Sequence, residues 1–218
     1  MKVTIHQPDL LPYSGFWFKM ATSDAFIVSK HDQFQKHGYQ RRVTMRDRWC
    51  SHMLEGKPSL VPITDVVVRE GWQQRLVDTI SGRYRGAPLW KQRGADLCER
   101  ILAAEGTRLD EVNLSLIYLI RELLGLTTPI LFTDPPQAHA RDRLIEQVQA
   151  VGGDEYLAGA GGRAYMGEDP EGYFADHGIT LTWSDHEHIT GDSVVSLLMD
   201  LEDPMPAILR RAGDQQRL

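Results

Sequence analysis

The sequence predicts an α/β fold, in which helices flank a central, mostly parallel sheet and a β-hairpin excursion and a helical segment are inserted in the middle. A strand, a helix and a second strand follow one another within residues 3–28. This is the length of a βαβ unit, which favours parallel pairing through a right-handed crossover. In the second half of the chain helical patterns alternate with short apolar runs, as expected for a parallel sheet. We expect a single domain over residues 1–218.

The first half of the chain contains three expected strands and a hairpin. We expect a strand at residues 3–5, an aromatic helix that starts at 16–18 and closes at 21–23, a second strand at 24–28 and a further β-prone piece at 66–68. Residues 42–45 are predicted to pair with residues 59–63, with 46–57 as the end of the hairpin.

A helical subregion is expected at about residues 71–125. Trp72, Leu76, Ile80 and Tyr84 recur at four-residue spacing, which places them on one helical face. Two more helices are expected at 89–104 and 109–124, and Gly125 is a plausible C-cap of the second. Beyond them we expect strands at 128–132, 155–158 and 179–183, helices at 138–151, around 173–174 and at 194–201, and a frayed tail from residue 208.

Composition restricts the function classes. The 218 residues carry a formal net charge of −6, and 42% of them are apolar. The chain can therefore bury a full core, and it lacks the net basic character of a general nucleic-acid or membrane-surface binder. No apolar run approaches the length of a membrane span, and we expect no secretion signal. Cys50 and Cys98 lie far apart without metal spacing, so we expect a reduced, cytoplasmic protein.

The candidate site begins where the first strand runs into His6-Gln7-Pro8. Ligands of open α/β folds bind at the carboxyl edge of the sheet, and this loop should lie there. His6, as a neutral imidazole, could act as a general base or donate to an oxyanion or phosphate, and Gln7 could add an amide donor. The alternative is that both side chains only hold the loop.

Asp32 follows the second strand and is expected at the neighbouring strand tip. There its carboxylate would orient the ring of His6 and raise its basicity, as in a base–orienter pair. A carboxylate that caps a turn is the alternative. The predicted catalytic residues are therefore His6, Gln7 and Asp32.

A short basic cluster follows on this otherwise acidic chain. Arginine presents a planar fork suited to phosphate or carboxylate. The cluster could hold a nucleotide phosphate, a phosphopantetheine arm or the acidic face of a carrier protein, or it could simply be solvated. The expected substrate-binding residues are those of this cluster, Lys36, Gln40, Arg41 and Arg42, together with Gln33 and with Tyr13 of the opening loop.

A glycine-rich turn follows the strand at 155–158 and could cradle an anion with backbone N–H groups. Its candidate binding residues are Gly159, Gly161, Gly162 and Tyr165, the last of which would close the pocket. No Gly-Lys-Ser/Thr follows, so this is not a Walker motif. Tight packing against the opening loop explains the glycines equally well.

Other polar residues have mainly structural interpretations. No histidine pair has a recognised metal spacing, so we assign no metal ligands. Asn113 is a polar residue on an apolar helix and should fix a loop by hydrogen bonds. Cys50 would be a nucleophile only if the fold placed His52 or His31 beside it, which the sequence leaves open.

Several of these segments together resemble one known family. The resemblance combines the His-Gln-Pro opening with the Tyr-Leu-Ala-Gly stretch and covers nearly the whole chain. The matching pieces are residues 5–8, 11–16, 23–28, 32–36, 39–43, 60–63, 153–159 and 194–200, with Asn113, Gly162 and Tyr165. On these motifs the chain resembles the WbqC-like protein family. It departs from the family at Gln40-Arg41-Arg42, where Gln-Asn-Arg is usual and this chain has an additional positive charge.

The resemblance implies a group-transfer enzyme of O-antigen or natural-product biosynthesis. Such an enzyme would form an amide by moving a small acyl or aminoacyl group onto an amine-bearing small molecule or sugar. An acyl or peptidyl carrier protein is the implied partner, and a phosphopantetheine-linked donor or ATP is the implied cofactor. We expect no nucleic-acid or membrane partner.

Two alternatives stay open. One is a nucleotide-dependent enzyme, either nucleotidyltransferase-like or adenylate-forming. The loop of the nucleotidyltransferases carries two histidines, whereas this loop has only His6. The other is a non-catalytic protein that binds a carrier or a sugar nucleotide.

Overall fold

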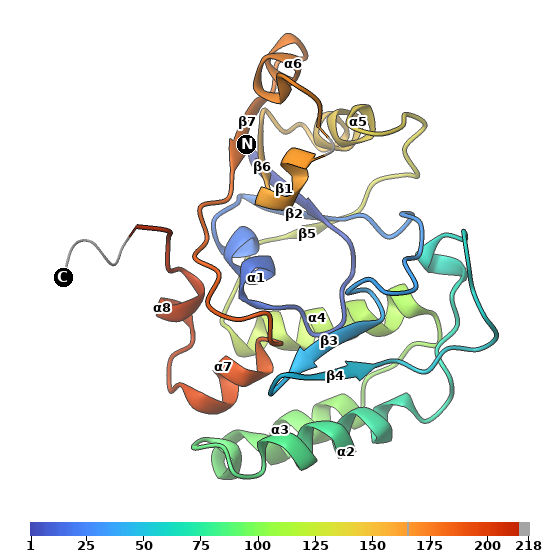
Figure 1. The fold of residues 1–218 in the computed structure, drawn as a ribbon, viewed down its shortest axis with the longest axis vertical. Helices are drawn as coiled ribbons and strands as arrows, with labels where there is room; N and C mark the ends of the chain where they lie inside the picture. Colours follow the sequence, from blue (N-terminus) through green and yellow to red (C-terminus); the bar gives the residue numbers. More distant parts are fainter. Residues whose placement is uncertain (165, 214–218) are drawn as a thin grey trace.

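A five-stranded parallel sheet forms the centre of the fold, as predicted (Figure 1). The structure, a computed structural model, describes residues 1–164 and 166–213. The strands are β1 (Lys2–His6), β2 (Ala25–Val28), β5 (Ile130–Leu131), β6 (Glu155–Ala158) and β7 (Thr180–Trp183). Their order is β5-β2-β1-β6-β7, so the chain starts in the middle of the sheet and extends it in both directions.

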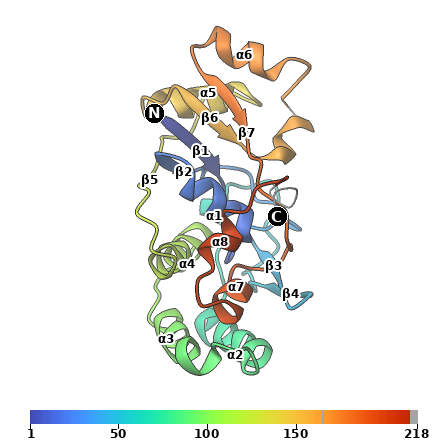
Figure 2. The same ribbon diagram turned by 90° about the vertical axis from the view of Figure 1, so that its left-hand side faces the viewer.

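Helices cover both faces of this sheet, and Figure 2 shows α1 and α4 on one side of the strands and α5 and α6 on the other. Their bounds are α1 (Ser14–Ala21), α4 (Leu109–Leu123), α5 (Asp142–Ala150) and α6 (Pro170–Asp176). Along β2, Phe26 and Val28 belong to the core beneath α1, whereas Ala25 and Ile27 belong to the core beneath α5. Alternating side chains of one strand therefore feed two cores, which makes its sequence apolar throughout.

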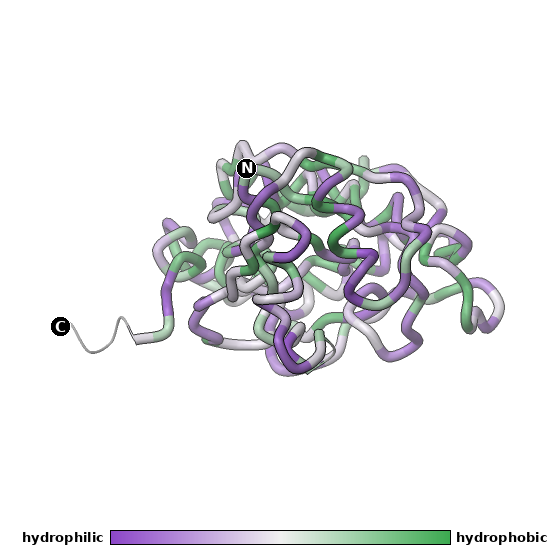
Figure 3. The backbone as a smooth tube through the Cα atoms, turned by 90° about the horizontal axis from the view of Figure 1, so that it is seen from above, coloured by the Kyte–Doolittle hydropathy of each residue, from purple (hydrophilic) through white to green (hydrophobic). Residues whose placement is uncertain are grey.

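The remaining helices extend the α1 side of the fold. They are α2 (Trp72–Tyr84), α3 (Trp90–Leu102), α7 (Val195–Asp200) and α8 (Met205–Ile208), with short 3₁₀ segments η1 (Ile63–Asp65) and η2 (Ala160–Ala164). Hydrophobic segments run through the middle of the molecule, while many of the outer turns are hydrophilic (Figure 3). No helix in the described part of the chain is long and apolar enough to cross a membrane.

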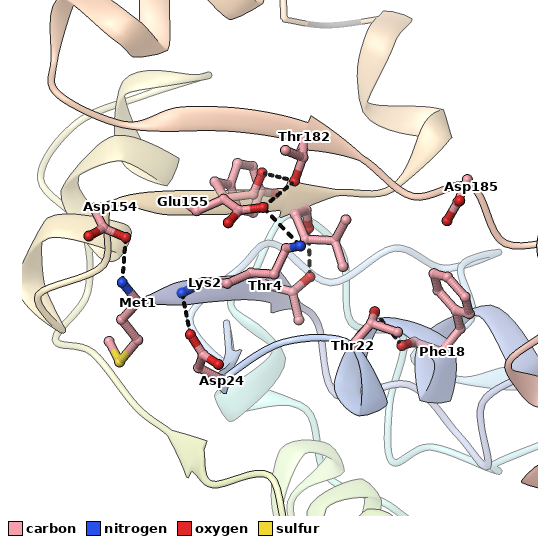
Figure 4. Close-up of polar contacts among 12 residues, drawn as sticks. Met1, Lys2, Thr4, Phe18, Thr22, Asp24, Asp154, Glu155, Thr182 and Asp185 are labelled. Atoms are coloured by element: carbon pink, nitrogen blue, oxygen red, sulfur yellow. Dashed lines mark hydrogen bonds and ion pairs between the residues drawn. The ribbon is translucent and has the colours of Figure 1, made fainter.

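Polar contacts at the amino ends of the central strands fix their register (Figure 4). Lys2 donates its backbone N–H to the Asp24 carboxylate at 2.7 Å, and its Nζ lies 2.8 Å from the Glu155 carboxylate. Thr4 Oγ1 donates to the carbonyl of Leu157 at 2.7 Å. These contacts tie β1 to both neighbours, so that His6, at the other end of β1, lies level with the end of β2.

The predicted pairing of the hairpin is wrong. β3 (Arg42–Met45) pairs not with residues 59–63 but with β4 (Arg48–Ser51), across a two-residue turn. Arg46 and Asp47 both have positive φ, 52° and 58°, as a type I′ hairpin turn requires. Neither is the expected Asn or Gly, but the Asp192 carboxylate accepts their N–H groups at 2.8 and 3.3 Å and holds the turn.

Other differences are smaller. Residues 66–68 make isolated bridges rather than a strand, and β5 is half-buried because it lies at the sheet edge. The short helix α8 was not predicted. Beyond it the chain does not fray at once, because Ala212 donates its N–H to the carbonyl of Asp185 at 2.7 Å. The other predicted helices and strands are present within a few residues of their expected bounds.

The Asp192 contact to the hairpin turn gives a first prediction. Asp192→Ala should lower the free energy of unfolding by about 1–3 kcal/mol, because it leaves two turn N–H groups and the Ser196 hydroxyl without their acceptor. Urea denaturation measures this change. Asp47→Asn is the matched control, since its side chain is exposed and Asn tolerates positive φ, and it should change stability by less than about 0.5 kcal/mol. Equal effects of the two variants would contradict this role of Asp192.

Candidate functional site

The candidate site lies at the carboxyl ends of β1 and β6. The connection after β1 runs through α1 on one face of the sheet, whereas the connection into β6 runs through α5 on the other. Such a change of direction between adjacent parallel strands opens a crevice at their carboxyl ends, where α/β proteins bind ligands.

Three ionisable side chains gather at this point, and two of them are almost fully buried. Asp9 and Lys19 are each 6% exposed. His6 Nδ1 lies 3.5 Å from Asp9 Oδ2, and the His6 side chain is 22% exposed. Lys19, on α1, reaches back to the carbonyl of Ile5 at 3.5 Å. Burying isolated charges costs free energy, so packing alone does not explain why these three side chains lie together.

The glycine-rich turn reaches the same cluster through Gly159. A Cβ at Gly159 would lie 3.8 Å from Lys19 Nζ, so the backbone after β6 runs close to the ammonium group. Gly162 is buried and donates its N–H to the carbonyl of Gly159 at 2.8 Å, while Gly161 is exposed. Tyr165, the predicted closing residue, lies outside the described residues.

Burial shifts the pKa of all three groups. Burial, together with the positive charge of Lys19, lowers the pKa of His6 to about 3. Burial raises the pKa of Asp9 to about 7 and lowers that of Lys19 to about 8, and in both cases the opposite charge of the partner limits the shift. His6 is therefore neutral at pH 7, and the other two groups titrate near neutrality, which is a feature of functional sites.

The tautomer of His6 follows from its neighbours. Nδ1 lies 3.0 Å from the carbonyl oxygen of Gln7, which can only accept, so Nδ1 carries the proton and donates it. Nε2 is left with its lone pair. The ring packs edge-on against Phe16, with centroids 4.9 Å apart. This is a fixed, neutral imidazole whose Nδ1–H is held by a backbone carbonyl and which has a carboxylate 3.5 Å away.

Tyr13 belongs to the same edge of the sheet. Burial raises the pKa of its phenol, as does the negative charge of nearby Asp9. Its ring lies across Gly15, where a Cβ would come within 2.6 Å of the Tyr13 hydroxyl. Glycine at the start of α1 is thus required for the ring position.

Asp32 does not orient His6, which corrects the sequence prediction. Its carboxylate accepts two hydrogen bonds from the Arg143 guanidinium at 2.7 and 3.0 Å, and another from Ser29 Oγ at 2.7 Å. Asp32 is 4% exposed, so it requires a paired cation, and α5 supplies one. The carboxylate beside His6 is Asp9 from the same loop.

Gln7 holds the loop, which is the structural alternative to its predicted catalytic role. Its Nε2 donates to Asp32 at 2.8 Å, and its Oε1 accepts from Gln40 Nε2 at 2.7 Å. Gln40 is fully buried and also binds the carbonyl of Gln33 and the N–H of Gln35. Both ends of each amide are used within the protein, so neither side chain is placed to bind substrate.

Asn113 fixes this region from α4, as predicted. Its Nδ2 donates to the carbonyls of Pro8 and Gln40 at 2.8 and 2.7 Å. Its Oδ1 lies 3.1 Å from His52 Nε2. The imidazole of His52, one of the two candidate bases for Cys50, is therefore engaged by Asn113. Burial raises the pKa of the Cys50 thiol, so it stays protonated at neutral pH.

The basic cluster lies on the hairpin side of the loop. Arg41 Nε donates to the carbonyl of His52 at 3.1 Å, and Arg42 Nε donates to that of His37 at 3.0 Å. Lys36 is exposed. These side chains are not in the buried His6 cluster.

Comparison with known proteins adds the family. Residues 7–190 match the WbqC-like protein family, which is well over half of the chain. The chain belongs to this family. It is also 23% identical over 194 residues to the uncharacterized protein Rv1507c of Mycobacterium tuberculosis, covering 85% of this chain and 83% of that one. No solved structure matches this WbqC-like protein.

The sequence prediction missed Asp9 and Lys19 of this WbqC-like protein. Asp9 lies between Pro8 and Pro12, where a polar residue is ordinary in a loop. Lys19 carried a stronger signal, because it is the one charge within the apolar run 15–21. A cation in such a run has to be buried or to lie at its edge. Only the packing of α1 against β1 shows that it is buried beside Asp9.

Burial is the main cause of the low pKa of His6, and the charge of Lys19 adds to it, which predicts a measurable pKa change when that charge is removed. Lys19→Met keeps the length and volume of the side chain but removes the cation, so the pKa of His6 should rise from about 3 towards its usual value of 6.5. An NMR titration of the imidazole measures this pKa. Lys36→Met, at an exposed position, is the control and should leave it unchanged. A His6 pKa that stays at its original value in Lys19→Met would rule out the coupling.

Asp9 should make folding stability depend on pH. Its pKa is raised from 3.8 to about 7, so the native protein holds a proton that the unfolded chain releases between these values. Its contribution to stability is therefore present at low pH and lost as pH rises through 7. The free energy of unfolding of Asp9→Asn, taken relative to that of wild type, should be higher at pH 8 than at pH 5 by on the order of 1 kcal/mol or more. Urea denaturation at both pH values tests this, with exposed Asp176→Asn as a control that shows no such difference.

Proposed function

We propose that this WbqC-like protein is an enzyme that transfers an acyl or aminoacyl group to an amine and forms an amide. The observation that carries the proposal is the fixed, neutral His6 with an unprotonated Nε2, placed with Asp9 and Lys19 at the switch point of the sheet. The family resemblance supports an amine-bearing small molecule or sugar as acceptor, in O-antigen or natural-product biosynthesis. We place this reaction in the cytoplasm, consistent with two unpaired cysteines.

In the proposed reaction, the amine nitrogen attacks the carbonyl carbon of a thioester donor. His6 Nε2 accepts an N–H proton as the carbon–nitrogen bond forms and negative charge develops on the carbonyl oxygen. Asp9, 3.5 Å from Nδ1, stabilises the imidazolium, and the Lys19 ammonium favours the oxyanion. The carbon–sulfur bond then breaks, and the proton on His6 passes to the leaving thiolate. The products are the amide and a free thiol.

A direct assay follows the thiol. Acyl and aminoacyl thioesters of pantetheine would be mixed with a panel of amines, including amino sugars, and thiol release and amide mass would be recorded. His6→Gln should lower the amine-dependent rate by about 10²–10⁴-fold, because it removes the proton acceptor. His31→Gln is the control and should retain the wild-type rate. The same rate in His6→Gln as in wild type, or no amide with any pair, would contradict the proposal.

A nucleotide-dependent enzyme is the second candidate, and the strand order favours it. The order β5-β2-β1-β6-β7 places β1 at the centre of a doubly wound sheet, as in mononucleotide-binding folds. In this version the acyl group would be activated as an adenylate before transfer, and Lys19 would face a phosphate. Calorimetric titration with ATP and CTP distinguishes the two, because the thioester reaction needs neither nucleotide.

A further inference from the structure

An exposed aromatic pair lies at the hairpin, formed by Trp49 on β4 and by Tyr39 just before β3, and an arginine is stacked on Trp49. Trp49 is 49% and Tyr39 is 53% exposed, and their ring centroids are 6.4 Å apart. The Arg42 guanidinium lies 4.1 Å from the centroid of the Trp49 ring. We call Tyr39, Arg42 and Trp49 the hairpin platform. Large rings exposed together at a functional edge are typical of ligand-binding surfaces.

The hairpin platform adjoins the loop that carries the buried cluster. The backbone N–H of Leu10, next to Asp9, donates to the carbonyl of Tyr39 at 2.9 Å. The phenol of Tyr39 is also close enough to that of Tyr13 to raise its pKa. The loop that carries Asp9 and the segment that carries Tyr39 are therefore in direct backbone contact. An extended ligand with one end at His6 and the other at Arg42 would cross this contact.

The two terminal nitrogens of the Arg42 guanidinium are suited to bind an anion. Its Nε donates to the carbonyl of His37 at 3.0 Å, and within residues 1–164 and 166–213 no carboxylate pairs with its two terminal nitrogens. Stacking on Trp49 holds the guanidinium flat, so less side-chain entropy is lost on binding. Two parallel N–H groups on a planar fork match a phosphate, with which arginine makes bidentate pairs.

We propose that the hairpin platform binds the phosphate ester of the acyl donor whose acyl end reaches His6. This inference rests on the proposed function and names its donor class: an acyl group joined through an extended arm to a phosphate. A phosphopantetheine thioester fits this description. A nucleotide offers Arg42 the same phosphate without such an arm, and the binding test separates the two sources.

Binding can be tested without turnover. Calorimetry would compare 4′-phosphopantetheine with pantetheine, and adenosine 5′-monophosphate with adenosine, on the full-length protein. In one of these pairs the phosphorylated compound should bind about tenfold or more tightly, which identifies the source of the phosphate. Arg42→Gln should abolish the difference, and Arg42→Lys should keep only part of it, because lysine lacks the fork and the stacked plane.

Arg48→Gln is the matched control on the same hairpin, and it should leave the preference for phosphate intact. Equal affinities within both pairs, or an unchanged preference in Arg42→Gln, would overturn the inference.

The thiol-release assay separates failure of the platform assignment from failure of the proposed function. Where 4′-phosphopantetheine is the preferred compound, Arg42→Gln should raise KM about tenfold more for a phosphopantetheine thioester than for a pantetheine thioester, which has no phosphate, and Arg48→Gln should change neither KM. If His6-dependent thiol release persists while the preference for phosphate is absent, only the platform assignment fails.

Discussion

The ion pair between Asp32 and Arg143 joins the loop after β2 to helix α5 on the far face of the sheet. It is bidentate, and the carboxylate is almost fully buried, so removing either partner would leave an uncompensated charge. The same carboxylate accepts from Gln7, whose other amide end is held by Gln40. Asp32 thereby fixes the residue whose backbone carbonyl sets the tautomer of His6.

A chain of satisfied polar groups spreads this constraint across the opening loop. Asn113, on α4, binds the carbonyls of Pro8 and Gln40, so the loop is attached to the helical layer as well as to α5. Such a network is valuable only when every member is paired, because a half-satisfied buried amide costs more than an apolar replacement. The loop can therefore present His6 and Asp9 in one geometry without depending on a bound ligand.

The contrast between the two acidic residues explains their different uses. Asp32 has a full set of donors and is a structural anchor. Among the residues that the structure describes, Asp9 has the long contact to His6 and the nearby charge of Lys19, and burial raises its pKa. A carboxylate held at the edge of ionisation beside a neutral imidazole is expensive for folding and useful for moving protons. Asp32 is thus a structural anchor, whereas the shifted pKa values lie at Asp9 and His6.

The sequence by itself determined the βαβ opening, most of the helices and the family, because apolar periodicity and local motifs are written within short segments. It also located His6 and Gly159 at one sheet edge, since the ends of adjacent parallel strands must meet. The tertiary structure alone decided the partners. Asp32 pairs with Arg143 from 111 residues away, and the hairpin turn depends on Asp192. Lys19 is buried close enough to Asp9 to influence its pKa only because α1 packs on β1. Burial and charge pairing are properties of the packed chain, so no local pattern could have assigned them.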